Sequence, residues 1–117
     1  MLKFYGYNKC NTCRNAKKWL EAKGKKFEEI DITLHPPRLS ELKEYVALSG
    51  RPLKDFFNKS GEQYRALHMK EKIKTLPESE ILQMLSKNGR LLKRPLVSDG
   101  KRATVGFDEK EFQKMWG

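Results

Sequence analysis

The chain has 117 residues, of which 38% are hydrophobic and 34% charged, a composition typical of a single soluble globular domain with a modest core. No run approaches 18 consecutive apolar residues, so a membrane span is excluded and a cytoplasmic location is expected. The 25 Lys and Arg residues outnumber the 15 Asp and Glu residues, for a net charge of +10, which favours acidic partners; the absence of a nucleic-acid-binding signature argues against direct nucleic-acid binding.

The first third of the chain predicts a β-α-β unit. Leu2–Tyr7 alternates apolar and polar residues, as a strand does. Apolar residues at helical spacing predict a helix over 12–23, with Asn and Thr caps offered by the polar loop 8–12 and a stop at Gly24. Phe27–Ile32 alternates again and predicts a second strand. A helix between two such strands implies a parallel pair with a right-handed crossover.

The middle of the chain, about residues 36–89, is predicted to be a helical block. Its segments show apolar residues at helical spacing and are bounded by prolines, glycines and capping residues. The predicted helices are one from its cap Ser40 to Gly50, two short ones within Arg51–Thr75 that are separated at Ser60-Gly61, and one from Pro77 that is closed by Asn88-Gly89.

The end of the chain predicts a hairpin and a last helix. Strands over Pro95–Ser98 and Arg102–Val105 flank an Asp-Gly-Lys turn, and Asp108 is placed to cap the helix that follows. The element order is therefore β-α-β, a helical block, then β-β-α. It predicts an α/β fold, a four-stranded mixed sheet with a helical insertion over about 36–89, in one domain that spans 1–117.

The two cysteines stand in a Cys-Asn-Thr-Cys motif at the predicted start of the first helix. Cys10 lies just before the helix and Cys13 in its first turn, so their sulfurs can approach each other. A helix N-terminus favours the thiolate, which is the reactive form of a thiol. The motif predicts a redox-active dithiol, in which Cys10 attacks an oxidised substrate and Cys13 resolves the intermediate. The alternative is two reduced cysteines that only pack at a helix start.

Polar neighbours of the motif are candidates for shaping the thiol environment. Arg14 adds positive charge, and Asn8 and Thr12 could donate hydrogen bonds to the sulfur, although both are also ordinary capping residues. A metal site is not expected. One Cys-x-x-Cys motif cannot fill a tetrahedral zinc site, and His35 and His68 lack the usual ligand spacing.

The pair Arg94-Pro95 is the second candidate element of the site. A proline that opens a strand facing the dithiol is the usual place for a cis peptide in thioredoxin-like folds; alternatively, it only starts an edge strand. Arg94 could steady a thiolate or bind an oxyanion through its bidentate guanidinium. It could equally be a surface charge that follows Arg90 and Lys93.

Two separated motifs carry a family resemblance. The segments Tyr7–Ala16 and Leu91–Val97, on either side of the helical block, resemble the ArsC/Spx family. That family comprises glutaredoxin-dependent arsenate reductases and Spx-type redox-sensing transcription regulators. The resemblance spans nearly the whole chain and implies a thioredoxin-like fold with a helical insertion. It implies no bound cofactor; glutathione, glutaredoxin or thioredoxin would serve as reductant.

The reductase branch of the family implies an oxyanion site. Arsenate reductases use a cysteine at the position of Cys10 and three arginines that grip the oxyanion. Arg94 matches one of these arginines, whereas the other two positions fall near Asn58 and Val105. Each missing charged contact is worth about 1.5–3 kcal/mol. Weak arsenate reduction is therefore expected, and a general thiol–disulfide oxidoreductase is the favoured activity.

The regulator branch implies a different partner. Cys13 looks like the second cysteine of the Spx-type dithiol switch, and Arg94 matches the arginine that those proteins place near it. Spx-type regulators contact the C-terminal domain of the RNA polymerase α subunit through the helical insertion, where a glycine matters; Gly50 is its nearest counterpart. The partner is thus a redox protein or thiol for an enzyme, or this polymerase domain for a regulator. A monomer is expected in both cases.

Overall fold

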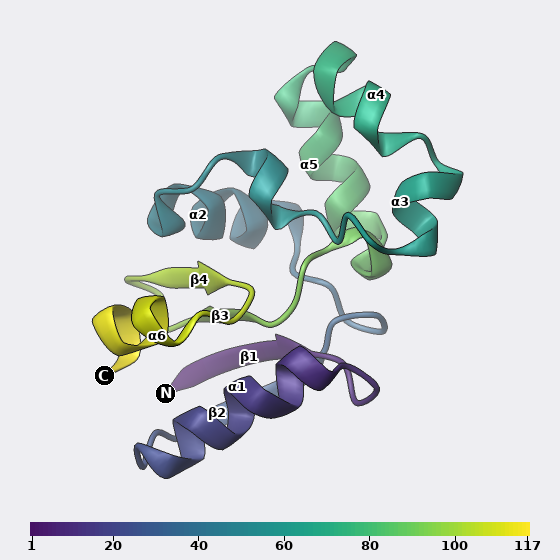
Figure 1. Ribbon diagram of the computed structural model, residues 1–117. Helices are drawn as coiled ribbons and strands as arrows, with labels where there is room; N and C mark the ends of the chain where they lie inside the picture. Colours follow the sequence, from purple (N-terminus) through teal and green to yellow (C-terminus); the bar gives the residue numbers. More distant parts are fainter.

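The computed structural model describes residues 1–117 and contains one sheet flanked by helices (Figure 1). The elements in chain order are β1 (Leu2–Gly6), α1 (Asn11–Ala22), β2 (Phe27–Asp31), α2 (Leu39–Ser49), η1 (Leu53–Phe56), α3 (Glu62–Ala66), α4 (Met69–Thr75), α5 (Glu78–Lys87), η2 (Gly89–Leu91), β3 (Leu96–Ser98), β4 (Ala103–Val105) and α6 (Glu109–Trp116). None of these helices has the length and apolar character that crossing a membrane requires.

The four strands form a mixed sheet in the order β2-β1-β3-β4. β1 pairs in parallel with β2, and β3 runs antiparallel to both β1 and β4. The predicted β-α-β unit and the terminal β-β-α unit are confirmed, as is the four-stranded mixed sheet. The central position of β1 matters for the site, because the loop that leaves its end starts from a strand held on both edges.

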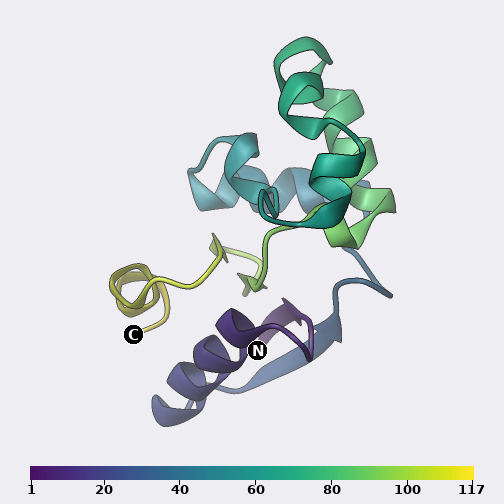
Figure 2. The same cartoon turned by 45° about the vertical axis from the view of Figure 1, so that its right-hand side comes forward.

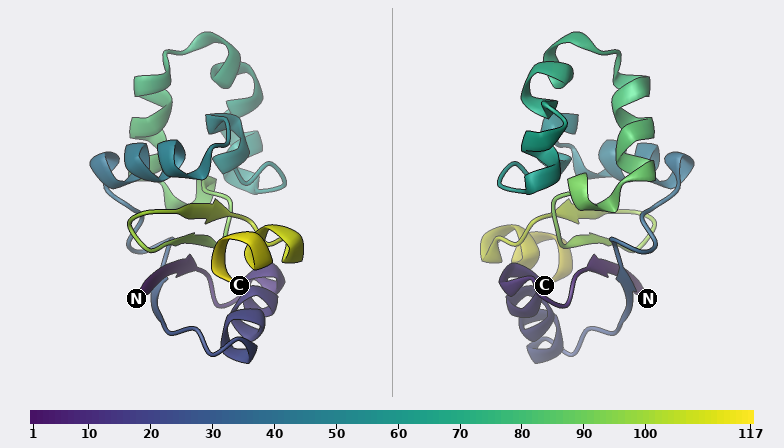
Figure 3. Two further views of the ribbon diagram at one scale, coloured as in Figure 1. Left: turned by 90° about the vertical axis from the view of Figure 1, so that its left-hand side faces the viewer. Right: turned by 90° about the vertical axis from the view of Figure 1, so that its right-hand side faces the viewer.

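Helices cover both faces of the sheet, and the alternation of side chains along the strands explains how. α1 and α6 lie on one face, and α2 lies on the other (Figure 3). Leu2 and Phe4 of β1 belong to the cluster under α1 and α6, whereas Tyr5 belongs to the cluster under α2. Successive residues of a strand point to opposite faces, so β1, with helices on both faces of the sheet, buries every residue except Lys3.

The smaller cluster includes one of the two motif cysteines. Its eight buried members are Leu2, Phe4, Cys13, Ala16, Leu20, Val97, Phe112 and Trp116. Three of them, at positions 13, 16 and 20, form the inner face predicted for the first helix. Packing of this face against the sheet therefore fixes the start of α1, and the dithiol with it.

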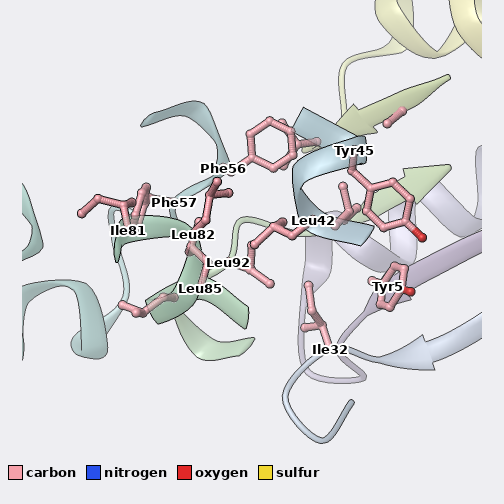
Figure 4. Close-up of a cluster of buried hydrophobic side chains, with 14 of the residues drawn as sticks. Tyr5, Ile32, Leu42, Tyr45, Phe56, Phe57, Ile81, Leu82, Leu85 and Leu92 are labelled. Carbon is pink, nitrogen blue, oxygen red and sulfur yellow. The ribbon is translucent and has the colours of Figure 1, made fainter. Parts of the chain in front are cut away.

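The helices between β2 and β3 form a body of their own above the sheet (Figure 2). A cluster of 15 buried residues joins this body to the strands. Within it, Tyr5 and Ile32 lie at the sheet, Tyr45 projects from α2, and Leu82 and Leu85 continue the cluster into α5 (Figure 4). The predicted helical segment thus shares one continuous apolar core with the sheet.

The start of α2 differs from the prediction. Ser40 lies inside the helix and is not its cap; the N-cap is Arg38. The backbone N–H of Arg38 donates to the Glu41 carboxylate at 3.2 Å, so the reciprocal contact of a capping box is made by the glutamate three residues on. The predicted end is confirmed, since Gly50 adopts a left-handed φ of 68° as the cap.

The stretch 51–75 contains three short helical pieces where two were predicted. The piece Leu53–Phe56 is a 3-10 turn, and the helices α3 and α4 follow it. The predicted break at Ser60-Gly61 precedes α3, and a second break falls at His68, which takes a left-handed φ of 53°. Nothing in the local apolar spacing distinguishes this residue from its helical neighbours.

Gly89 does not close α5 as a left-handed cap. Asn88 is the C-cap in an extended conformation, and Gly89 opens the turn η2. A Cβ atom on Gly89 would lie 1.8 Å from the backbone oxygen of Ile32. The glycine is therefore required because the chain entering β3 passes directly against the end of β2.

We expect Gly89→Ala to lower the free energy of unfolding of the reduced protein by about 3 kcal/mol, at the upper end of overpacking costs, because two backbone segments must separate. Gly24→Ala is the matched control. Gly24 has a φ of 69° but no atom near its Cβ position, so only left-handed strain of about 1–2 kcal/mol is added. Urea unfolding followed by circular dichroism measures both; equal losses would contradict the steric explanation.

Candidate functional site

The dithiol lies at the junction between the loop that follows β1 and the start of α1. Cys10 is itself the N-cap of that helix. Its φ of −98° and ψ of 114° are extended, and its Sγ accepts the backbone N–H of Cys13 at 3.3 Å. The loop is closed by the N–H of Cys10, which donates to the carbonyl of Tyr7 at 3.1 Å. The sulfur therefore occupies the capping position for which the sequence suggested an Asn or Thr oxygen.

The two thiols have different access to solvent. Both cysteines are free, with Cys10 half-buried and Cys13 buried at 1% exposure. Gly6 makes room for the inner thiol, since a Cβ there would lie 3.4 Å from Cys13 Sγ and 2.6 Å from the Phe4 ring. This arrangement gives one reachable sulfur and one protected sulfur three residues apart.

The protonation of Cys13 follows from its position. Burial, together with the neighbouring Cys10 sulfur, raises the pKa of the Cys13 thiol to about 12. A hydrogen bond from the Tyr7 backbone and the positive charge of Arg94 act in the opposite direction and lower the pKa. Burial dominates, so Cys13 is a neutral thiol near pH 7 while Cys10 is free.

The predicted polar environment of the thiols is only partly present. Asn8 and Thr12 are exposed, and neither side chain forms a hydrogen bond with the sulfur of Cys10. Arg14 is also exposed; its guanidinium donates to the Asn8 carbonyl and to the Asn11 side chain. These residues brace the outside of the loop. Side chains at the first positions of a helix point towards solvent unless they pack in the core. This explains why these three side chains are exposed and do not contact the Cys10 sulfur.

Arg94 is positioned beside the dithiol and is not the surface charge of the alternative interpretation. The Arg94-Pro95 peptide bond is cis, which is the first of the two alternatives that the sequence left open, and Pro95 is buried. The guanidinium carbon lies 5.2 Å from the centroid of the Tyr7 ring, within the range of a cation–π contact. Its Nη1 is buried and has no hydrogen-bond acceptor. A buried donor without a partner is uncommon, so Arg94 keeps an unsatisfied hydrogen-bond donor in this part of the molecule.

A small cavity adjoins Arg94. It has a volume of about 190 Å³, and its lining includes Tyr7, Arg94, Arg90 and Asn58. The structure thus places Asn58 beside Arg94, although 36 residues separate them in the sequence. The local sequence gave no signal for the participation of Tyr7 or Gly6, since both depend on contacts made after folding.

The remaining candidate positions lie elsewhere. Val105 is buried within the sheet, and Arg102 donates to Asp99 at 3.2 Å and stacks over the Trp116 ring. Arg94 and Arg90 therefore supply the guanidinium groups of the cavity. Gly50 ends α2 and is exposed; the residue after it, Arg51, bonds to Glu111 of α6. The structure does not bring Gly50 to the dithiol.

Comparison with known proteins agrees with this architecture. The model of the ArsC family matches residues 5–115. The uncharacterized protein YusI of Bacillus subtilis is 51% identical over 98% of both chains. The global transcriptional regulator Spx of Enterococcus faecalis is 30% identical over 98% of this chain and 86% of its own length.

A solved structure shows the same fold. The crystal structure of an ArsC family related protein from Bacteroides fragilis has a TM-score of 0.93 and 40% identity, covering 97% of this chain and 95% of that one. The mixed sheet with helices on both faces is the predicted thioredoxin-like architecture, with the helical segment between β2 and β3. With the family model covering nearly the whole sequence, the chain belongs to the ArsC family.

Proposed function

We propose that this ArsC family member is a thiol–disulfide oxidoreductase in which Cys10 attacks a disulfide and Cys13 resolves the mixed disulfide. One observation carries the proposal: a half-buried Cys10 sulfur caps α1, and the fully buried Cys13 lies three residues on, its N–H donating to that sulfur. Accessible and protected thiols at this separation are what a two-step exchange needs.

The first step uses the helix start. Thiolate charge on Cys10 is stabilised by the N–H of Cys13 and by the positive end of the α1 dipole. Cys10 attacks one sulfur of the substrate disulfide. A bond forms between that sulfur and Cys10, the substrate S–S bond breaks, and the departing thiolate takes a proton from water.

The second step is favoured by the first. While Cys10 is free, two causes raise the pKa of Cys13: its burial and the neighbouring Cys10 sulfur. In a mixed disulfide Cys10 has no charge, so this contribution is lost, whereas the Tyr7 backbone and Arg94 still lower the pKa. Cys13 then loses its proton more readily and attacks Cys10, releasing the second substrate thiol. The dithiol has supplied two electrons, and glutathione, glutaredoxin or thioredoxin would restore it.

We expect Cys13→Ser to accumulate a mixed disulfide when it is mixed with an excess of hydroxyethyl disulfide, because Cys10 attacks and nothing resolves. Cys10→Ser should stay unmodified, since its remaining thiol is buried. The wild-type protein should pass to an intrachain disulfide. Intact mass and a thiol count measure all three.

The same mass and thiol-count assay also tests arsenate as an oxidant and tests whether the Cys10–Cys13 disulfide can form at all. Arsenate in place of the disulfide should leave the wild-type thiols reduced, because Asn58 and Val105 stand where arginines would hold the oxyanion. A Cys10–Cys13 disulfide that fails to form even with diamide would refute the redox proposal and favour a binding module.

The raised pKa of Cys13 predicts how stability depends on pH. The folded state keeps the Cys13 thiol proton up to a pKa of about 12, whereas the ordinary pKa of a cysteine thiol is 9.0. Above pH 9 the unfolded chain releases a proton that the folded chain retains, so the free energy of unfolding of the reduced protein falls as pH rises from about 9 towards 12, by at most about 1.4 kcal/mol per pH unit.

Cys13→Ala removes this contribution and should show a shallower decline in a urea series across that range. The variant is less stable below pH 9 because it leaves a small cavity, so the slope above pH 9 is the informative quantity. Parallel curves for the two proteins would contradict the assignment.

A second candidate function is a redox-sensing regulator. The similarity to relatives named global transcriptional regulator Spx, over 98% of this chain, favours it, as does an exposed Gly50 in the helical segment that such a partner would contact. A pull-down of the RNA polymerase α C-terminal domain tests it. Retention that depends on the dithiol state and is lost in Gly50→Arg would support the regulator; no retention in either state would exclude it.

A further inference from the structure

A groove lined by lysines crosses the helical segment. Its hollow has a volume of about 540 Å³; Tyr64 and Ile73 supply its apolar surface, and four lysines surround them. These lysines are Lys54, Lys59, Lys70 and Lys74. We call this hollow the basic groove. The ion pairs of the chain engage other cations, namely Lys3, Lys17, Arg38, Arg51 and Arg102, so the ammonium groups of the groove are available to a partner.

The basic groove leads towards the dithiol. Lys59 also lines a hollow of about 280 Å³ together with Asn58 and Lys93. Asn58 in turn lines the cavity of about 190 Å³ that contains Arg94 and Tyr7. In the fold, α3 and α4 stand on the same side of the molecule as the loop between β1 and α1 (Figure 1). A chain of adjoining hollows therefore connects the lysines to the residues beside Cys10.

The lysines and the apolar floor of the basic groove indicate which class of ligand it can bind. Unpaired lysines attract carboxylates, and an apolar floor accepts an apolar side chain; a polypeptide with acidic residues carries both. A nucleic acid fits less well. The hollows end beside a dithiol, which needs a sulfur atom to react with, and a nucleic acid offers none.

We propose that the substrate of the dithiol is an acidic polypeptide segment that lies in the basic groove and presents its disulfide to Cys10. This inference rests on the proposed oxidoreductase function and adds the class of substrate. The reaction balances as before: the dithiol is oxidised to the Cys10–Cys13 disulfide, the disulfide of the acidic segment is reduced to two thiols, and the two thiol protons of the protein end on the products. The net charge of +10 speeds the encounter with such a segment.

The test compares peptides that differ only in charge. Each peptide contains one cysteine held as a mixed disulfide with thionitrobenzoate, flanked by either glutamates or glutamines. At low ionic strength we expect the glutamate peptide to oxidise the reduced protein at least about 10-fold faster than the glutamine peptide, and this advantage should shrink as salt is added. Stopped-flow release of thionitrobenzoate gives both rates.

Charge-reversal variants locate the effect. The triple variant Lys59→Glu, Lys70→Glu, Lys74→Glu should bring the glutamate peptide to within about 2-fold of the glutamine peptide or below it. The control Lys18→Glu, Lys43→Glu, Lys114→Glu changes the net charge equally on exposed positions of α1, α2 and α6, and it should keep most of the advantage. The control variant should react with hydroxyethyl disulfide at the wild-type rate, and the rate of the groove variant with the glutamine peptide is the reference for its own dithiol.

Three outcomes would overturn the inference. Equal rates for the two peptides would remove the acidic preference, and equal losses in both triple variants would assign it to net charge alone. Tighter binding of a single-stranded oligonucleotide than of an equally charged, cysteine-free glutamate peptide, by fluorescence anisotropy with Cys10→Ala, would favour nucleic acid.

If the proposed oxidoreductase function is wrong, the kinetic measurements give a different result from the three outcomes above. In that case no disulfide, hydroxyethyl disulfide included, reacts with Cys10, and the substrate assignment falls with the function. The anisotropy measurement with Cys10→Ala then shows separately whether the groove binds acidic peptide.

Discussion

The hydrogen bond from the Cys13 N–H to the Cys10 sulfur is the contact on which the site depends. At a helix start the first N–H groups have no partner within the helix, and here a thiol sulfur satisfies one of them at 3.3 Å. The same contact begins α1, holds Cys10 at the positive end of its dipole and places Cys13 in the first turn. Helix initiation and thiol chemistry therefore share one set of atoms.

The rest of the fold holds this contact in place. β1 is paired on both edges, so the end of the strand that feeds the loop has little freedom. α1 is anchored by the smaller cluster through Cys13, Ala16 and Leu20. On the other side of the dithiol, the chain entering β3 brings Arg94 over the Tyr7 ring. The site is thus assembled where the first and last thirds of the chain meet.

Features governed by neighbouring residues could be predicted from the sequence. Alternation predicted the strands, helical spacing predicted the inner face of α1, and the glycines at positions 24 and 50 marked helix ends, because each signal is local. The Cys-x-x-Cys spacing indicated the dithiol for the same reason. Arg94-Pro95 was recognised as a site element, but the choice between a buried and a surface arginine needed the structure.

Features that depend on contacts between distant residues could not be predicted. The need for glycine at position 89 comes from the Ile32 backbone, and the cavity joins Asn58 to Arg94. The capping sulfur of Cys10 was missed for a different reason: oxygen caps are far commoner, so Asn and Thr were favoured. The extra break at His68, where a left-handed residue separates α3 from α4, has no local signal.

The membership of Cys13 in a packed core has a consequence for what a disulfide with Cys10 would do to the surrounding side chains. A bond between the two sulfurs draws one atom of the smaller cluster towards the helix start, and Trp116 is a member of that cluster while Trp19 packs against it. Protein interiors are close to crystal density, so such a displacement is passed to neighbouring rings and not absorbed in empty space. Both indoles of the chain therefore lie where a disulfide between Cys10 and Cys13 would change their packing.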